Sequence, residues 1–172
     1  DYYEKGALIK WNPAVKTSDD QQALWDGLLN DKLDIIATDH APHTISEKNN
    51  LYFQCPSGAP MVQHALPLML QHSLSDKITI EKVVEKMCHA PANCFKIKKR
   101  GFIREGYYAD LVVVRKTKPW TVSKDNILYG CKWSPLEGKS FDFRVSHTFV
   151  NGNLVYKNGN LIEIENGQAL TF

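Results

Sequence analysis

The pattern that most constrains this chain is a strand, a helix and a second strand within about thirty residues. Residues 7–12, "ALIKWN", predict a short strand. Residues 21–30, "QQALWDGLLN", carry apolar positions at helical spacing, and Asp19 or Asp20 precedes them as a candidate cap. Residues 33–38, "LDIIAT", form an apolar run typical of a parallel strand that is buried on both faces. Together these segments predict a parallel crossover unit of an α/β fold.

The pattern changes near residue 96, where helical periodicity gives way to strands and tight turns. The segment "GFIREGYYADLVVV" has two glycines followed by a hydrophobic strand. The Asn-Gly pairs at 151–152 and 158–159 suit type I′ hairpin turns, because both central residues of such a turn need a positive φ. We therefore expect an α/β part over residues 1–95 and a mainly β part over residues 96–172.

Composition narrows the classes of partner. The chain has 172 residues, of which 43% are hydrophobic and 23% charged, with a net charge of +2. No basic stripe accompanies this charge, so neither nucleic acid nor a membrane surface is an expected partner. No apolar stretch is long enough to span a bilayer. The four cysteines have no two-residue spacing, which favours reduced thiols in a cytoplasmic protein. The first residue is Asp1 rather than Met, which suggests a fragment.

The segment "ATDHAPHT" places an acid and two histidines directly after the second predicted strand. Catalytic groups in parallel α/β folds sit just past the carboxyl ends of strands, and Asp39 has that place. With His40 and His43 it offers the oxygen and nitrogen ligands that zinc takes in proteins. The alternative is ordinary turn chemistry, in which the acid caps a turn and the histidines bond to the backbone. The spacing alone leaves both readings open.

With these residues in view, the sequence resembles the dihydroorotases, which are metal-dependent members of the amidohydrolase superfamily. The segment "IKWNPAVKTSDDQQALWDGLLNDKLDIIATDHAPH" is similar to that family's last two barrel strands. "PSGAPMVQHALPLML" resembles its substrate loop and the helix that follows. "GFIREGYYADLVVV" and "SPLEGKSFDFRVSHTFVNGNLVY" resemble the β domain appended to amidohydrolase barrels. The pair "TDHAPH" and "PSG" is what indicates dihydroorotase within the superfamily.

The resemblance implies a fold class and a set of residue roles. Residues 1–95 would be the carboxyl-terminal part of a (β/α)₈ TIM-like barrel with zinc at the carboxyl ends of its strands, and residues 96–172 a small β-sandwich domain. Asp39 would bind metal and shuttle a proton, and His43 would bind the substrate carboxylate. The remaining substrate contacts would be Asn12, at the pyrimidine ring, and the backbone groups of Ser57 and Gly58. His40 is expected to be structural.

The activity implied is the zinc-dependent, reversible hydrolysis of dihydroorotate to N-carbamoyl-L-aspartate in pyrimidine biosynthesis. A catalytic zinc has three protein ligands, whereas Asp39 is one. The family's other ligands for one or two zinc ions would lie upstream of Asp1. We therefore expect this segment to be inactive alone and to need the amino-terminal part of the same protein; the resemblance also leaves a homodimer open. Two alternatives are another cyclic amidohydrolase, such as an allantoinase or hydantoinase, and a non-catalytic dihydroorotase-like subunit that scaffolds a partner such as aspartate transcarbamoylase.

Overall fold

The computed structural model describes residues 2–165 and 167–172, and these residues divide into two compact units that alternate along the sequence. The first unit contains residues 2–33, 37–68 and 120–140. The second contains residues 34–36 and 69–119, together with the described residues from 141 onwards. Each unit is assembled from separated segments, so the domain boundary near residue 96 stays a prediction.

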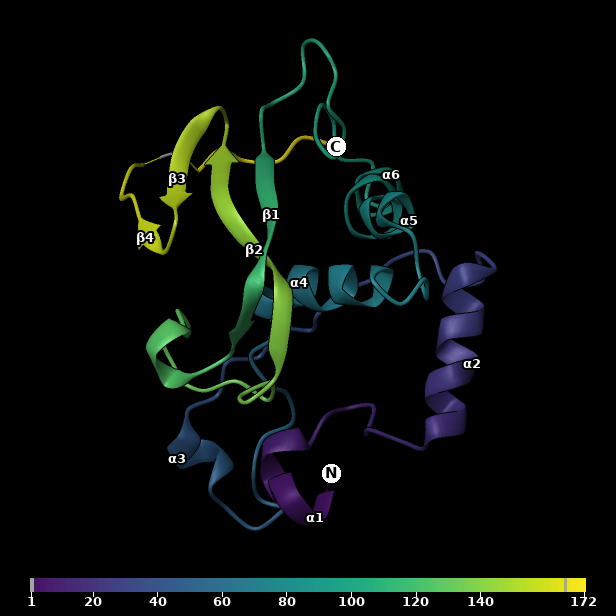
Figure 1. Ribbon diagram of the computed structural model, residues 1–172, viewed down its shortest axis with the longest axis vertical. Coiled ribbons are helices and arrows are strands. Elements are labelled where there is room, and N and C mark those ends of the chain that lie inside the picture. Colours follow the sequence, from purple (N-terminus) through teal and green to yellow (C-terminus); the bar gives the residue numbers. More distant parts are fainter. Residues whose placement is uncertain (1, 166) are drawn as a thin grey trace. The chain divides into compact units, whose positions relative to one another are not determined.

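The first unit is mainly helical. Its elements are α1 (Tyr2–Lys5), the 3-10 helix η1 (Gly6–Ile9), α2 (Ser18–Leu29), α3 (Ile45–Lys48), the first part of α4 (Val62–Ser73) and the 3-10 helix η3 (Lys124–Asn126) (Figure 1). Its buried apolar side chains come from all three of its segments and include Ile9, Leu28, Ala59, Ala65, Val122, Ile127, Tyr129 and Trp133. The segment 120–140 is therefore part of the same core as the loops that follow α2.

Helix α2 confirms the predicted helix but begins with a different cap. Thr17 is the N-cap, and its hydroxyl accepts a hydrogen bond from the Asp20 N–H at 3.3 Å. The Asp20 carboxylate in turn accepts from the Thr17 N–H at 3.0 Å, which completes a capping box. Thr17 is the cap rather than Asp19 or Asp20 because the helix begins earlier than predicted, at Ser18, so that Asp20 occupies the third helical position. Leu28 is 7% exposed and Leu24 is 61% exposed, so the expected apolar face is only partly covered.

The two predicted strands before residue 40 are absent from the part of the chain that the structure describes. Residues 6–9 form η1, and residues 33–38 carry no strand. A strand requires a neighbouring strand that pairs with its backbone. In the described structure the N–H groups of residues 33–38 donate instead to helical residues, from Leu33 to the Gly27 carbonyl and from Ile36 to the Lys86 carbonyl. A single parallel bridge joins His40 to Ala59. Both strand predictions are therefore wrong.

The second unit combines short helices with a four-stranded sheet. The helical elements are α5 (Ile80–Val84), the single π turn η2 (Glu85–His89) and α6 (Ala90–Cys94). The strands are β1 (Leu111–Thr121), β2 (Ser140–Val150), β3 (Asn153–Lys157) and β4 (Asn160–Leu161). They pair in the order β1-β2-β3-β4, as Figure 1 shows, which confirms the β-rich character expected after residue 96.

The hairpins of this sheet confirm the turn predictions. Asn151 and Gly152 have φ values of 51° and 83°, and the second Asn-Gly pair has 48° and 98°. Both pairs thus have the positive φ at two consecutive residues that a type I′ turn requires. Strands β2 and β3 pair antiparallel, from Val150 opposite Asn153 to His147 opposite Lys157. The chain direction therefore reverses twice at positions that the sequence specifies.

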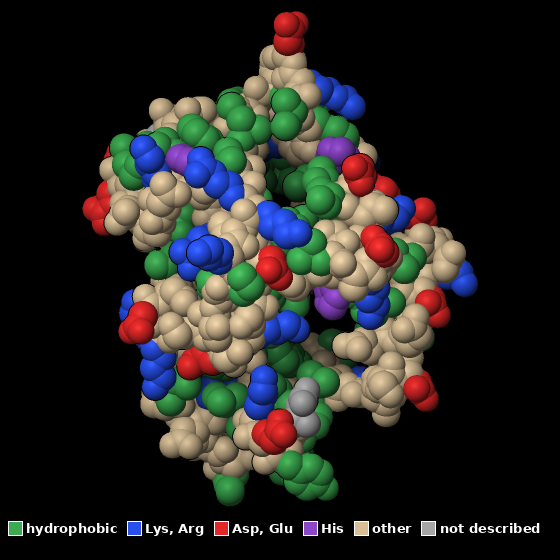
Figure 2. Space-filling model, viewed as in Figure 1, with side chains coloured by type: hydrophobic (Ala, Val, Ile, Leu, Met, Phe, Trp, Pro, Cys, Tyr) green, Lys and Arg blue, Asp and Glu red, His purple; other side chains and the backbone are tan. Residues whose placement is uncertain are grey.

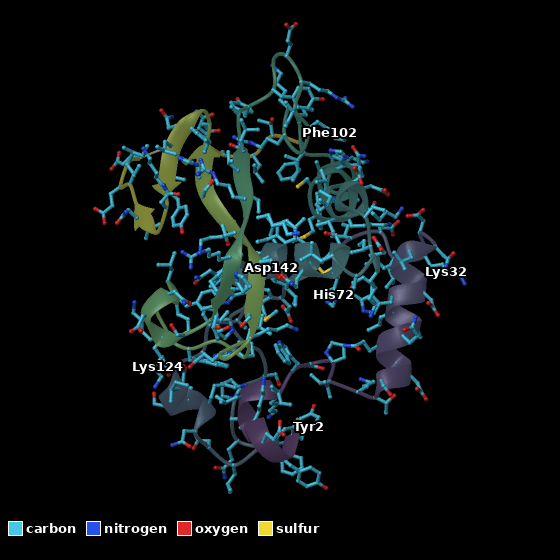
Figure 3. All side chains as sticks on the ribbon, in the orientation of Figure 1. Tyr2, Lys32, His72, Phe102, Lys124 and Asp142 are labelled. Carbon is cyan, nitrogen blue, oxygen red and sulfur yellow. The ribbon has the colours of Figure 1, made fainter. Side chains whose placement is uncertain are left out.

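Side chains from the helices and the sheet form the core of the second unit. Its buried apolar residues include Leu70, Ile78, Val83, Ala92, Phe141 and Phe143. On α4 the Gln71 amide donates to the Asp142 carboxylate of β2 at 2.6 Å and accepts from the Asp142 N–H at 2.8 Å. Figure 3 labels Asp142 on this strand. The paired bonds fix the end of α4 against the sheet.

Charged side chains are interspersed on the face shown in Figure 2, where blue, red and apolar green groups alternate. None of the helices in the described ranges is long and apolar enough to cross a membrane.

Candidate functional site

Asp39 lies in a turn of unusual backbone conformation. Its φ is +44°, in the left-handed region, and its side chain is exposed. A non-glycine residue pays roughly 1–2 kcal/mol to adopt this region, although aspartate tolerates it better than most. Such outliers gather at functional sites, where the surrounding structure holds them. The turn thus presents to solvent the carboxylate that the sequence analysis selects as a candidate catalytic group.

His40 has a structural partner. Its Nδ1 accepts hydrogen bonds from the N–H groups of Met61 at 3.0 Å and Val62 at 3.4 Å. These N–H groups lie at the start of α4, where the backbone has no helical acceptor. The Tyr129 ring packs against the imidazole, with ring centroids 5.3 Å apart. His40 therefore fastens the Asp39 turn to the helix start, which agrees with the structural role expected for it.

His43 is held from two sides. Its Nε2 lies 3.1 Å from the Ser57 carbonyl oxygen, and a carbonyl can only accept, so Nε2 donates. Its own carbonyl oxygen accepts from the Trp133 indole N–H at 2.8 Å. The imidazole is half-buried. The backbone bonding that ordinary turn chemistry predicts is thus present at this histidine, and it uses one of the two ring nitrogens.

Gly58 explains how the "PSG" loop approaches the Asp39 turn. It is buried with φ +116°, and a Cβ added there would lie 2.5 Å from the Ala41 Cβ. Only glycine allows this contact, because any side chain would collide with the turn. The Gly58 N–H also donates to the Lys10 carbonyl at 2.8 Å, two residues before Asn12. Asn12 itself is exposed.

The structure therefore brings together most of the residues that the sequence selects. The bond from His43 to Ser57 and the bond from Gly58 to Lys10 join the turn, the "PSG" loop and the segment that carries Asn12. Asp39 is connected to the same loop through the adjacent His40–Ala59 bridge.

Sequence reasoning missed three residues that hold this arrangement: Lys48, Tyr129 and Trp133. Lys48 ends α3, a helix that begins with a capping box between Thr44 and Glu47. The T-x-x-E spacing is a recognised start signal and could have predicted that helix. The two aromatic residues lie about ninety positions from the turn they contact, as the Trp133 bond to His43 shows. No local pattern reveals contacts at that separation.

A buried cluster lies behind the site in the first unit. The imidazole of His64 is fully buried, and its Nδ1 lies 3.1 Å from the Ser134 hydroxyl and 3.4 Å from the Tyr129 hydroxyl. Burial lowers the pKa of His64 to about 4 and raises the pKa of Tyr129 to about 12. Both side chains are therefore neutral near pH 7, which suits a supporting layer rather than an acid or base.

The described side chains do not by themselves form a catalytic zinc site. Within the ranges that the structure describes, no three His, Cys, Asp or Glu side chains are grouped so that they could hold a metal ion. Asp39 offers one carboxylate, whereas catalytic zinc is held by three protein ligands. His40 and His43 have other partners on one ring nitrogen each. The described residues thus supply one candidate ligand and not a complete site.

The sequence of this chain is similar to those of known proteins. The sequence profile described as "Amidohydrolase family" matches residues 12–155. The chain is 34% identical over 168 residues to a dihydroorotase of Pyrococcus horikoshii, covering 98% of this chain and 39% of that relative. It is 37% identical over 151 residues to a dihydroorotase of Listeria welshimeri, covering 87% of this chain and 35% of the relative. The chain therefore spans about two fifths of the length of the curated relatives it matches.

Solved structures show the same fold. An L-hydantoinase (dihydropyrimidinase) from Arthrobacter aurescens matches with a TM-score of 0.89 and 26% identity, over 99% of this chain and 39% of that one. A D-hydantoinase from Thermus sp. matches with a TM-score of 0.85 and 23% identity, over 94% and 36%. The family match includes Asn12, Asp39, His43, Ser57 and Gly58. With the sequence profile covering most of its length and the α/β fold shared with these structures, the chain belongs to the amidohydrolase family.

Proposed function

We propose that this chain forms part of a dihydroorotase, which hydrolyses the cyclic amide of dihydroorotate reversibly to N-carbamoyl-L-aspartate in pyrimidine biosynthesis. The observation that carries the proposal is the bond between the two diagnostic motifs. His43 of "TDHAPH" donates to Ser57 of "PSG" at 3.1 Å. Two segments that point to the same substrate are therefore adjacent in space, and the relatives at 32–37% identity are named dihydroorotases.

Asp39 is the proposed proton carrier. As water adds to the amide carbonyl carbon, one of its O–H bonds breaks and the Asp39 carboxylate takes the proton. When the C–N bond of the tetrahedral species breaks, the same group delivers that proton to the departing ring nitrogen, which regenerates the carboxylate. The exposed position and strained turn of Asp39 support this role, because they present the carboxylate to a ligand rather than to the core.

His43 and its neighbours are the proposed substrate contacts. The Nε2 of His43 is occupied by the Ser57 carbonyl, so its Nδ1 is the nitrogen that faces a ligand carboxylate. The carboxamide of Asn12 would meet the pyrimidine ring, and the backbone groups of Ser57 and Gly58 would hold it. Fixed contacts of this kind raise the rate because the reacting amide is held near the attacking water.

The metal is proposed to be zinc, one or two ions, with Asp39 as the ligand from this chain and the remaining ligands from protein outside these residues. When bound, the metal would polarise the amide carbonyl and lower the pKa of the attacking water. The proposed partner that supplies those ligands is the amino-terminal part of the same protein. The protein is further proposed to be cytoplasmic and to assemble as a homodimer.

The test is an assay of the protein produced from its complete native coding sequence. We expect hydrolysis of dihydroorotate, loss of activity on metal removal and recovery on adding zinc. The 172-residue chain alone should be inactive and should not retain zinc. Activity of the isolated chain would contradict the proposed need for further ligands, and a fully inactive complete protein would favour the scaffold alternative.

A second candidate is a hydantoinase, favoured by the TM-score of 0.89 to the Arthrobacter enzyme. The two candidates differ in the substrate carboxylate, since dihydroorotate carries one on its ring and the parent hydantoin does not. Parallel assays with dihydroorotate, hydantoin and allantoin separate them. The dihydroorotase proposal expects the highest kcat/KM with dihydroorotate.

A further inference from the structure

Lys48 is a charged side chain in the interior of the site. It is 1% exposed, and its ammonium donates to three backbone carbonyls. The acceptors are Lys10 at 3.3 Å, Pro56 at 3.0 Å and Gly58 at 3.0 Å. An ammonium has three N–H donors, so each donor has a carbonyl partner. Desolvation by burial lowers the pKa of Lys48; the charge of Cys55 opposes this, and the nearby Lys10 ammonium lowers the pKa further.

The three carbonyls belong to the segments that carry the proposed substrate contacts. Pro56 directly precedes Ser57, Gly58 is itself a proposed contact, and Lys10 lies two residues before Asn12. Lys48 is the last residue of α3, the short helix that follows His43 and its N-cap Thr44. One nitrogen therefore connects the histidine turn, the "PSG" loop and the Asn12 segment.

A neighbouring lysine, Lys10, also donates to backbone carbonyls and provides a comparison with Lys48. The Lys10 ammonium donates to the Tyr52 carbonyl at 2.8 Å and the Cys55 carbonyl at 2.7 Å. These bonds join the Asn12 segment to the loop that precedes Pro56, and neither acceptor is one of the proposed substrate contacts. Lys48 differs because its acceptors come from two separate segments and include Gly58. Desolvating a charge is costly, so a loop that needed only to be filled would be served better by an apolar side chain.

We propose that Lys48 is a positioning residue, whose ammonium sets the orientation of the backbone at residues 56–58 relative to Asn12 and His43 for substrate binding. The inference rests on the proposed function, because it assigns the held loop to dihydroorotate. A methionine at this position would fill similar space but would donate to none of the three carbonyls. The loop would then relax, and small displacements of a binding loop are enough to weaken a well-oriented site by on the order of tenfold to a hundredfold.

The experiment compares Lys48→Met, Lys48→Arg and Lys32→Met in the complete protein. Lys32 is an exposed lysine near the end of α2, labelled in Figure 3, and serves as the matched control. For Lys48→Met we expect a KM for dihydroorotate raised by about tenfold or more, with kcat and zinc content changed much less. Lys48→Arg keeps the charge but cannot direct three N–H groups from one nitrogen, so an intermediate KM is expected. Lys32→Met should match the wild type.

Hydrogen exchange followed by mass spectrometry gives a readout that does not depend on activity. Faster exchange confined to the amides of residues 52–60 in Lys48→Met is the expected result. A lowered melting temperature with an unchanged KM and unchanged exchange would overturn the proposal, because Lys48 would then act only on stability. If Lys48→Met fails to fold, an unchanged KM in Lys48→Arg overturns it equally. A wild-type protein that does not hydrolyse dihydroorotate refutes the proposed function instead, and the exchange result then decides the role of Lys48 separately.

Discussion

The Nε2 nitrogen of His43 donates to the carbonyl oxygen of Ser57 across 3.1 Å. This bond places a proton on Nε2, because a carbonyl oxygen can only accept a hydrogen bond. For Nδ1 also to donate to a substrate carboxylate, the ring must carry both protons and a positive charge. The proposed role of His43 would therefore require the doubly protonated ring when the anionic substrate binds.

The first prediction concerns the contact between His43 and the substrate carboxylate. In His43→Gln a neutral amide replaces the ring, and a neutral donor bonds a carboxylate more weakly than a charged one, so KM for dihydroorotate should rise by about tenfold. Steady-state kinetics of the complete protein measure this. His147→Gln, on strand β2, serves as the control and should match the wild type. An unchanged KM in His43→Gln would contradict the proposed role.

The second prediction concerns the close approach of Gly58 to Ala41. Gly58→Ala places a methyl group 2.5 Å from the Ala41 Cβ in a backbone region that alanine rarely adopts. We expect a loss of about 1–3 kcal/mol in the free energy of unfolding and a raised KM. Gly130→Ala is the matched control, since nothing lies within 4 Å of its added Cβ. Denaturant unfolding tests both variants, and equal stability of the two would show that the loop does not need its close contact.

The third prediction concerns the indole of Trp133. Trp133→Phe keeps an aromatic ring in a site that is 2% exposed but removes the 2.8 Å bond to the His43 carbonyl. A hydrogen bond of this kind contributes about 1 kcal/mol net, so a loss of that size is expected. If the bond also orients the turn, KM should rise by about fivefold. Trp25→Phe, on α2, is the control. Unfolding and kinetic measurements that show no change in either quantity would refute the contribution.

The fourth prediction concerns pH-dependent stability through His64. Burial lowers its folded-state pKa from 6.5 to about 4, so the unfolded chain binds the proton more tightly. The free energy of unfolding should therefore be unaffected by this group above pH 6.5 and should fall as pH drops from about 6.5 to about 4, by about 3 kcal/mol. His64→Gln should have a shallower slope in that window. A slope equal to that of the wild type would show that the buried imidazole does not resist protonation.

Local patterns predicted the parts of the fold whose causes are local. The helix over α2 follows from apolar spacing and a cap, and the turns at Asn151-Gly152 and Asn158-Gly159 follow from backbone preferences of single residues. The strands expected at residues 7–12 and 33–38 were wrong because a strand depends on a partner that the described segments do not provide.

The candidate site also contains residues that the sequence reveals and residues that only the structure reveals. Asp39, His43 and the "PSG" loop stand out in the sequence because each lies within a short motif. Lys48 and Trp133 do not stand out in the sequence, because they lie in no recognisable motif and have acceptors up to ninety positions away. Residue types were thus enough to propose the chemistry of the site, whereas the contacts that hold these residues together required the structure.

The most direct test of the central claim is the rate of dihydroorotate hydrolysis by Asp39→Asn in the complete protein. An amide cannot accept and return the water proton, so kcat should fall by on the order of a thousandfold or more, with folding unchanged. The exposed Asp125 on η3 supplies the control Asp125→Asn, which should match the wild type. Retention of wild-type kcat by Asp39→Asn would contradict the account.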